Sequence, residues 1–325
     1  MNTRLPNSSQ RARIIGYACG LGAGAVWGTT GPLSTALYAE GAAISAVGFW
    51  RLLLAVLGFT IYGVFVRDLF RIDRRGILLI MILGGALVAL FEVPFQYAIA
   101  GLGVAPAVAL LYTAPVTVAI AGHFILKEKL TPLRIALAVG VMIGVWLTVH
   151  GEAADQSQPT ASRLVGILGG LIAAASYAAT AILARYVVPR YGSKKMLYWE
   201  LVGGLLFLAI LLPMFGKTPH APGDAAAWVY IAALGIGAVV AANFLFFAAM
   251  KRIDAAPASV AASVEPLVGA LLSLLLFNQQ LRWFGWVGLL MVVGGVAGGY
   301  AEEAGELGEG EGEGEMNREP VSRSL

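Results

Sequence analysis

The sequence predicts an all-α integral membrane protein of ten transmembrane helices, arranged as two five-helix repeats of opposite orientation. Three observations support this fold class. The 325 residues are 58% hydrophobic and only 13% charged, with a mean hydropathy of +0.78, whereas about 25% of residues are charged in a typical soluble domain. The charges fall in short clusters, separated by apolar stretches of roughly 20 residues, the length of a spanning helix. An internal repeat also appears at an offset of 151 residues.

The apolar stretches between the charge clusters are the expected spanning helices. They lie at 14–34, 44–65, 77–97, 104–125, 133–150, 164–186, 196–214, 226–249, 256–277 and 283–301. The first stretch does not have the form of a cleavable signal peptide, because its apolar run continues past Trp27 instead of ending at a small-residue cleavage site.

The basic residues predict the orientation. With the N-terminus in the cytoplasm, 18 Lys and Arg residues fall on the cytoplasmic side, and only Arg163, Lys217 and Arg282 fall outside. Such a bias is what the positive-inside rule requires. We therefore expect a multi-pass protein of the cell inner membrane with both termini cytoplasmic. The basic excess is scattered over short loops, which indicates contact with anionic lipid and not with nucleic acid.

The repeat defines the domains. Residues 1–150 form the first repeat and 151–301 the second, and the prolines Pro115 and Pro266 match at the 151-residue offset. Because five spans are an odd number, the second repeat begins on the opposite side of the membrane and is inverted, a recurrent plan among secondary transporters. Residues 302–325 are a Glu/Gly-rich tail, which we expect to be disordered and cytoplasmic.

Two segments carry a resemblance to a known family. The segment from Tyr97 to Glu128 and its counterpart from Phe247 to Gln279 resemble the stretch that ends each repeat of EamA-type carriers in the drug/metabolite transporter superfamily, as does Trp27-Gly28. The resemblance covers residues 14–301. It implies ten helices, cytoplasmic termini and export of amino acids or other small metabolites, with aromatic amino-acid exporters as one subgroup. The sequence departs from the family pattern at Gln279, where Glu is usual.

Four ionisable residues lie within predicted spans: Arg51, Glu92, Glu200 and Glu265. A charge in the bilayer core costs about 2.5 to 3.5 kcal/mol on insertion scales, so such a residue faces a partner or a cavity. For Arg51 and Glu200, structural pairing or snorkelling competes with a functional role. For Glu92 and Glu265 we favour a cavity role, in which the carboxylate carries a proton or binds a substrate ammonium.

The candidate substrate-binding residues combine these carboxylates with nearby polar and aromatic side chains. Gln96 follows Glu92 at i+4, on the same helix face, and Asn243 occupies the repeat-related position. Aromatic rings suit an aromatic or cationic substrate, although aromatics near span ends also form the interfacial belt. The full set is Trp27, Trp50, Glu92, Gln96, Tyr112, Tyr177, Asn243, Phe247 and Glu265. The mid-span prolines Pro115 and Pro266 are candidate hinges, with a static kink as the alternative.

Several function classes are disfavoured. The single Cys19 and three dispersed histidines provide no metal site, and no Walker motif is present. No cofactor is therefore expected. The polar residues are too few for a wide channel, and no dense cluster of acid, His or Cys indicates an enzyme. The sequence favours a secondary carrier for small solutes, driven by the solute gradient or by protons. A multidrug or organic-cation exporter is the alternative, and the chain is expected to be a monomer or a homodimer.

The glycines of the first span recur every four residues, at Gly16, Gly20, Gly24 and Gly28. Small residues at this spacing allow two helix backbones to approach closely. We expect tight helix packing along this face.

Overall fold

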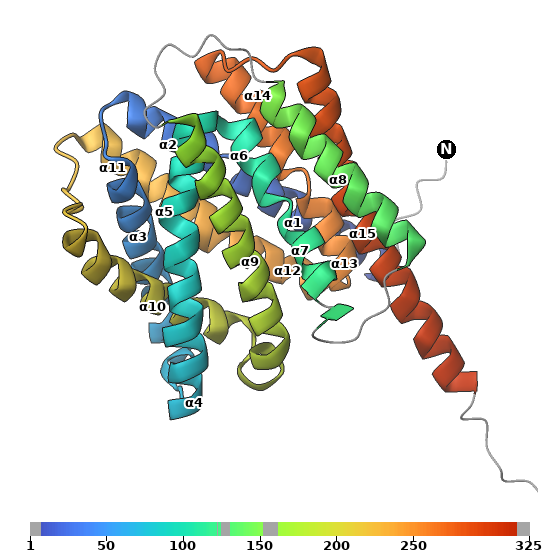
Figure 1. Cartoon of the computed structure of the whole chain (residues 1–325). Coiled ribbons are helices and arrows are strands. Elements are labelled where there is room, and N and C mark those ends of the chain that lie inside the picture. Colours follow the sequence, from blue (N-terminus) through green and yellow to red (C-terminus); the bar gives the residue numbers. More distant parts are fainter. Residues whose placement is uncertain (1–7, 122, 125–130, 152–161, 317–325) are drawn as a thin grey trace, which may run out of the picture.

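A computed structural model describes residues 8–121, 123–124, 131–151 and 162–316 of the chain. Within these ranges the protein is almost entirely helical (Figure 1). This is the expected outcome for so apolar a chain, because a helix satisfies the backbone N–H and C=O groups of a spanning segment internally.

Nine helical segments among the described residues are long and apolar enough to cross a membrane. They are α3 (Ile44–Phe65), α4–η2–α5 (Arg74–Leu102), α6–α7 (Val104–Ala121), α8 (Pro132–His150), α9 (Arg163–Tyr191), α10 (Ser193–Met214), α11–η4–α12 (Ala225–Met250), α13–α14 (Ala255–Phe277) and the first part of α15, Trp283–Glu302. They match nine of the ten predicted spans.

The first predicted span, 14–34, falls on two helices. α1 (Ser8–Gly28) ends at Thr29, and α2 (Thr30–Ala39) follows. The Thr29 hydroxyl donates to the carbonyl of Val26 at 2.7 Å, which satisfies one acceptor at the end of α1. α1 is not among the nine segments, because its glycines and the two arginines Arg11 and Arg13 dilute its apolar character. The expectation of ten crossing helices is thus confirmed for nine, and the tenth stays a prediction.

The predicted tail also differs from expectation at its start. α15 (Trp283–Met316) continues through 302–316, where the sequence favoured disorder. These residues extend a helix that already exists, and extension is much easier than nucleation. Residues 317–325 lie outside the described residues.

Helix boundaries follow local sequence signals. Thr131 caps α8, accepting from the backbone N–H of Arg134 at 3.1 Å, and Pro132 occupies the first helical position. Gly103 and Gly192 connect successive segments at φ of +83° and +79°, a region that favours glycine. Each of these turns is a single residue long, so the segments on either side of it lie close together.

Two irregularities recur at corresponding places in the two halves. α6 (Val104–Leu111) and α7 (Ala114–Ala121) separate at Tyr112–Thr113, while α13 (Ala255–Ala262) and α14 (Glu265–Phe277) separate at Ser263–Val264, 151 residues later. Pro115 and Pro266 therefore lie in the first turn of a new helix and do not kink a continuous one. The π-helical segments η2 (Ile77–Gly84) and η4 (Ala233–Ala241) form the second pair. Such segments are rare and frequent at functional sites.

The predicted close packing of α1 is confirmed. A Cβ atom added to Gly24 would lie 2.3 Å from the carbonyl oxygen of Ala262, and one added to Gly28 would lie 2.8 Å from that of Glu265. The face of α1 therefore rests directly on the backbone of α13 and α14. α8 and α15 lie side by side at one edge of the bundle (Figure 1), where a Cβ on Gly288 would meet the Gly144 carbonyl at 2.5 Å.

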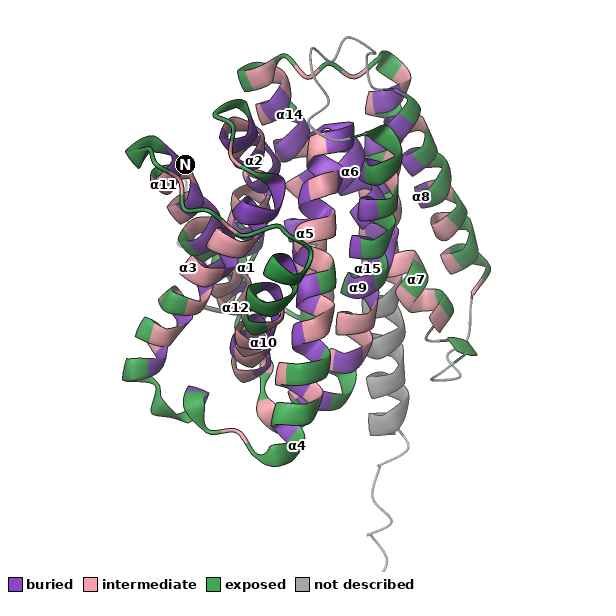
Figure 2. Ribbon diagram, turned by 60° about the vertical axis from the view of Figure 1, so that its left-hand side comes forward, coloured by how far each residue is buried: buried purple, intermediate pink, exposed green. Residues whose placement is uncertain are grey.

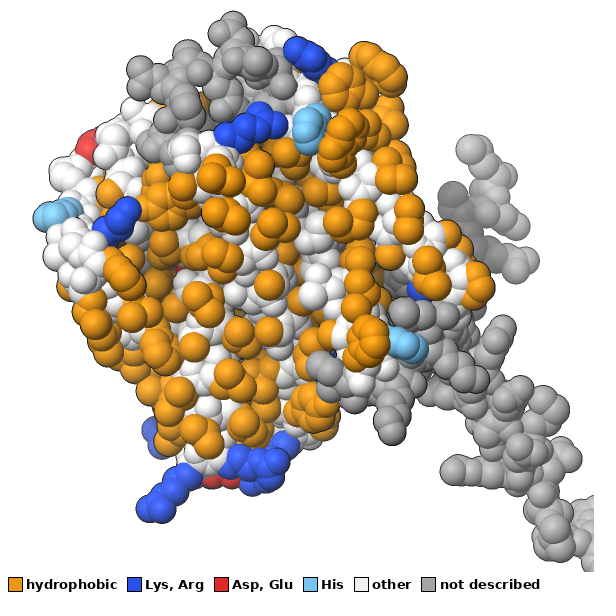
Figure 3. Space-filling model, in the orientation of Figure 1, with side chains coloured by type: hydrophobic (Ala, Val, Ile, Leu, Met, Phe, Trp, Pro, Cys, Tyr) orange, Lys and Arg blue, Asp and Glu red, His pale blue; other side chains and the backbone are white. Residues whose placement is uncertain are grey.

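The surface has the form expected in a bilayer. Large apolar side chains such as Phe65 (83% exposed) and Leu275 (77%) cover its flank, and the buried residues lie between the helices (Figure 2). Lys and Arg gather at the two ends of the bundle (Figure 3). We call the end that carries residues 67–75 and 190–195 the basic end. The other end, which carries Gly103 and Lys217, is called the opposite end.

Candidate substrate-binding site

A buried ion pair joins α3 and α5 (Gly85–Leu102). The Nε atom of Arg51 lies 3.3 Å from Oε2 of Glu92, and the two residues are only 6% and 4% exposed. Of the two interpretations open for Arg51, pairing with an acid is the one observed. Nε and Nη1 of Arg51 and Oε2 of Glu92 have no hydrogen-bond partner among the described residues. Buried polar atoms without partners are rare in proteins, so this pair has unused binding capacity.

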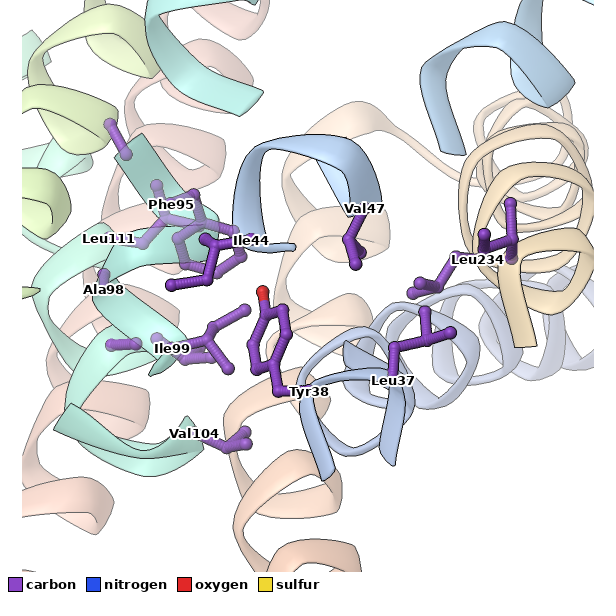
Figure 4. Packing of buried hydrophobic residues seen from close by; sticks show 14 of the residues in the cluster. Leu37, Tyr38, Ile44, Val47, Phe95, Ala98, Ile99, Val104, Leu111 and Leu234 are labelled. Carbon is purple, nitrogen blue, oxygen red and sulfur yellow. The ribbon is translucent and has the colours of Figure 1, made fainter. Parts of the chain in front are cut away.

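Gln96 lies one turn beyond Glu92, as its spacing predicted. Its Oε1 accepts a hydrogen bond from the hydroxyl of Tyr38 at 2.5 Å, while its Nε2 is buried without a partner. Tyr38, on α2, was not predicted from the sequence, because the loop that brings α2 against α5 has no local signal. Figure 4 shows Tyr38 among Ile44, Phe95 and Ile99.

A layer of apolar side chains closes the bundle beside this polar group. The layer includes Leu37, Val47, Ile99, Val104 and Leu234, all at most 2% exposed. It lies toward the opposite end, where α2, α3, α5, α6 and the start of the Ala225–Met250 segment meet (Figure 4). The polar group is therefore shielded from that end of the bundle.

Glu265 forms a second polar centre, in the second repeat. It lies at the break between α13 and α14, and its Oε2 accepts a hydrogen bond from the hydroxyl of Tyr112 at 3.2 Å. Tyr112 lies at the matching break between α6 and α7. Both were predicted site residues, and the two chain breaks bring them into contact.

Tyr177 faces the interior but remains accessible. It is 53% exposed, although it lies on the α9 face that includes the buried Gly170 and Ala173, seven and four residues earlier. Its ring centroid is 6.1 Å from that of Phe91, and its hydroxyl lies within electrostatic range of Glu265. The exposed area of Tyr177 therefore opens onto space inside the bundle.

The remaining predicted residues occupy three different places. Trp27 packs on Phe246 with ring centroids 5.4 Å apart. Asn243 donates to the Val239 carbonyl of its own helix at 2.7 Å. Phe247 lines a pocket of about 340 Å³ near the basic end, together with Tyr62, Tyr191, Lys194, Lys195 and Lys251. Trp50 lies near the opposite end, in contact with Trp228.

Glu200 is a buried carboxyl without an observed partner. It is 7% exposed on α10, and its Oε2 has no hydrogen-bond partner among the described residues. In the same part of the chain, no three His, Cys, Asp or Glu side chains form a group able to hold a metal ion.

Asp73 fastens two loops at the basic end. Its carboxylate accepts from the Gly76 N–H at 2.8 Å, the Tyr191 hydroxyl at 2.6 Å and the Arg190 guanidinium at 2.6 Å. The hydrogen bond from Tyr191, with those from Gly76 and Arg190, holds the pKa of Asp73 below its ordinary value of 3.8.

Replacing Asp73 by Asn should lower the melting temperature at pH 7 and leave it unchanged in strong acid. Because the folded pKa is depressed, the carboxylate contributes stability above pH 3.8, and this contribution is lost as the pH falls through the lowered value. Thermal unfolding of both proteins in detergent between pH 7 and pH 2.5 measures the difference. Asp224→Asn is the matched control, because Asp224 caps α11 (Ala225–Ala232) without a side-chain hydrogen bond. An equal deficit for Asp73→Asn at every pH would contradict this account.

A bundle of apolar helices that buries an ion pair and a tyrosine-bound carboxyl between its repeats defines a class of protein, the polytopic membrane transporters. Residues 14–150 and 164–299 each match the EamA-like transporter family. The chain belongs to this family.

Relatives in other organisms agree. An uncharacterized transporter of Archaeoglobus fulgidus is 28% identical over 255 residues, which span 77% of this chain and 84% of that protein. The uncharacterized transporters YetK and YoaV of Bacillus subtilis are 24% and 25% identical, over 57% and 58% of this chain and 56% and 63% of their own lengths. A solved crystal structure aligns with a TM-score of 0.61 at 18% identity, over 89% of this chain and 96% of the other, which shows a shared fold.

Proposed function

We propose that this transporter is a secondary carrier that exports amino acids or similar small metabolites by alternating access. The observation that carries the proposal is the buried Arg51–Glu92 pair beside Gln96, in which three side chains retain polar atoms without partners. A zwitterionic amino acid offers a carboxylate to the Arg51 donors and an ammonium to the Glu92 oxygen. Intramembrane charges of this kind mark substrate pathways.

The proposed topology has ten crossings in two inverted repeats. α1 and α2 together would supply the tenth, and the matching chain breaks and π segments at offsets near 151 residues support the repeat. Under the positive-inside rule, the basic end faces the cytoplasm of a cell inner membrane, with both termini on that side. Reporter fusions at the two termini test this topology, since an external signal from either terminus contradicts it.

The arrangement corresponds to a carrier that faces the cytoplasm. The apolar layer closes the opposite end, while the pocket around Phe247 lies near the basic end. A solute would enter from the basic end and reach Tyr177 and Glu265 before the Arg51–Glu92 pair. Alternating access then requires the apolar layer to open while the basic end closes.

An organic-cation exporter is the second candidate. Glu265 with Tyr112 and the accessible ring of Tyr177 would suit a cation, through charge and cation–π contact. Such a substrate would make no use of the unpaired Arg51 donors, so the amino-acid proposal accounts for more of the buried atoms.

Substrate screening tests the proposal directly. A thermal-shift series of the purified protein against amino acids, their amides and quaternary ammonium ions should show stabilisation by amino acids that requires the free carboxylate. Stabilisation by the amides or the ammonium ions alone would favour the organic-cation function. Saturable uptake of the stabilising compound into proteoliposomes would separate a carrier from a channel.

Proton coupling should depend on the two carboxylates Glu92 and Glu265. If either carries the coupled proton, replacing both by Gln should abolish the pH dependence of transport, because Gln cannot exchange a proton. Uptake into proteoliposomes with and without an imposed pH gradient measures this. Glu40→Gln is the control, since Glu40 is an exposed residue at the end of α2. A double variant whose residual transport keeps its pH dependence would remove the proton-coupling proposal.

A further inference from the structure

Two tryptophans occupy the same place in the two halves of the molecule. Trp50 is the seventh residue of α3, and Trp199 is the seventh residue of α10. Each is followed by a buried ionisable residue, Arg51 in the first case and Glu200 in the second, which are 6% and 7% exposed. The two helices start at opposite ends of the bundle, so the two tryptophans lie on opposite sides of the apolar belt.

Their hydrogen bonds cross between the repeats. The indole N–H of Trp50 donates to the carbonyl of His220 at 3.1 Å, in the loop that follows α10. The indole N–H of Trp199 donates to the carbonyl of Leu69 at 3.0 Å, in η1 (Arg67–Phe70), which follows α3. The acceptors are 151 residues apart, the same offset as the repeat. Each helix therefore holds the loop that leaves the other helix.

Charged and polar groups fasten the same two loops. At the basic end, Lys195 pairs with Asp68 at 3.0 Å. At the opposite end, the ammonium of Lys217 donates to the hydroxyl of Tyr97 at 2.5 Å. α3 and α10 also share one apolar core, in which Leu52 and Phe59 meet Leu201 and Leu208. The two helices and their crossed loops thus form one fastened unit.

Each fastened loop leads into a π-helical segment that lies on the other repeat's helix. The loop held by Trp199 leads through α4 (Arg74–Gly76) to η2, where a Cβ on Gly203 of α10 would lie 1.8 Å from the carbonyl oxygen of Met81. The loop held by Trp50 leads through α11 to η4, where a Cβ on Gly235 would lie 2.6 Å from the carbonyl oxygen of Arg51. The backbones touch at both places.

The π segments continue into the helices that carry site residues. η2 runs into α5, which bears Glu92 and Gln96, and η4 runs into α12 (Ala242–Met250), which bears Asn243 and Phe247. A change between π and α geometry alters the number of residues per turn and rotates the helix that follows. If the loop before the π segment is held, that rotation must appear at the site residues and not in the loop.

We infer that Trp50 and Trp199 are positioning residues for transport, each of which sets access from its own side of the membrane through the loop it holds. This inference rests on the proposed alternating-access function. Loss of the Trp199 bond should release the loop at the basic end and favour opening there. Loss of the Trp50 bond should release the loop at the opposite end and favour opening there. The two substitutions should therefore change accessibility on different sides.

Labelling of single cysteines tests this. In a Cys19→Ala background, Ser45→Cys reports the opposite end, where Ser45 is 5% exposed, and Ser193→Cys reports the pocket at the basic end. Trp→Phe keeps a ring and removes only the N–H donor. With a membrane-impermeant maleimide, Trp50→Phe should speed labelling at position 45 about 2- to 10-fold, the effect of losing one net hydrogen bond. Trp199→Phe should do the same at position 193. In each case the other reporter should be unchanged or slower.

The control is Trp283→Phe, a residue 77% exposed with no indole hydrogen bond among the described residues, which should change neither reporter. Equal acceleration of both reporters by both variants would show general loosening and overturn the assignment, as would no change in either. Counterflow of the solute that stabilises the protein is measured in parallel. If it is absent in the wild type while the labelling pattern holds, the proposed function fails and the side-specific positioning stands.

Discussion

Replacing Glu92 by Gln is expected to destabilise the protein by about 3 to 5 kcal/mol, because it leaves the Arg51 guanidinium buried without a countercharge. Arg51 is 6% exposed, and Glu92 is its only acidic partner among the described residues. The free energy of unfolding, followed by denaturant titration in detergent, measures the loss.

The matched double variant separates charge from packing. Arg51→Met with Glu92→Leu removes both charges and keeps apolar bulk, so it should unfold within about 1 to 2 kcal/mol of the wild type. It should bind no amino acid, because the carboxylate and ammonium contacts are both gone. A single variant Glu92→Gln as stable as the wild type would show that the pair is not buried as described. A double variant that still transports would remove the pair from the substrate site.

Replacing Gly203 by Ala is expected to be the most damaging conservative change in the helix interfaces. An added Cβ would lie 1.8 Å from the Met81 carbonyl oxygen and 3.0 Å from Cα of Gly85, and backbone cannot move aside as a flexible side chain can. Overpacking costs typically 1 to 3 kcal/mol, and displacement of a backbone carbonyl places this site at about 3 kcal/mol or more. Thermal unfolding and the yield of monodisperse protein measure the effect.

Gly140→Ala on α8 is its control. A Cβ there meets nothing within 4 Å, and Ala is the better helix former by about 0.8 to 1.0 kcal/mol. It should leave the melting temperature equal or raise it. If both variants lose the same stability, the contact between α10 and η2 is not as close as described.

Much of the fold could be predicted because the bilayer imposes strong rules. The spans from 44–65 onward follow from hydropathy, and the glycines of α1 predicted its close packing. The break at Thr29 could not be predicted, because no proline marks it. The π segments η2 and η4 were equally hidden, since their residues, such as Ile77–Gly84, are as apolar as any α-helical span. The tail was misjudged at 302–316, because composition does not show that a preceding helix can continue.

The candidate site was predicted by residue type more than by contact. The i, i+4 spacing placed Gln96 beside Glu92, and the matching prolines directed attention to Tyr112 and Glu265. The partners of these residues come from distant segments: Tyr38 for Gln96, and Arg51 for Glu92. Trp50, predicted to bind substrate, instead holds the loop at His220. Tertiary packing decides such pairings, and a single sequence does not record it.

The central claim is that this EamA-family protein is a carrier with a site built on Arg51 and Glu92. Counterflow in proteoliposomes tests it most directly, with the amino acid that best stabilises the purified protein as the solute. Preloading with the unlabelled amino acid should accelerate entry of the labelled one, with saturation, in the wild type, and the Arg51→Met/Glu92→Leu variant should show neither. Uptake that rises linearly with concentration and ignores the preloaded solute would contradict the account.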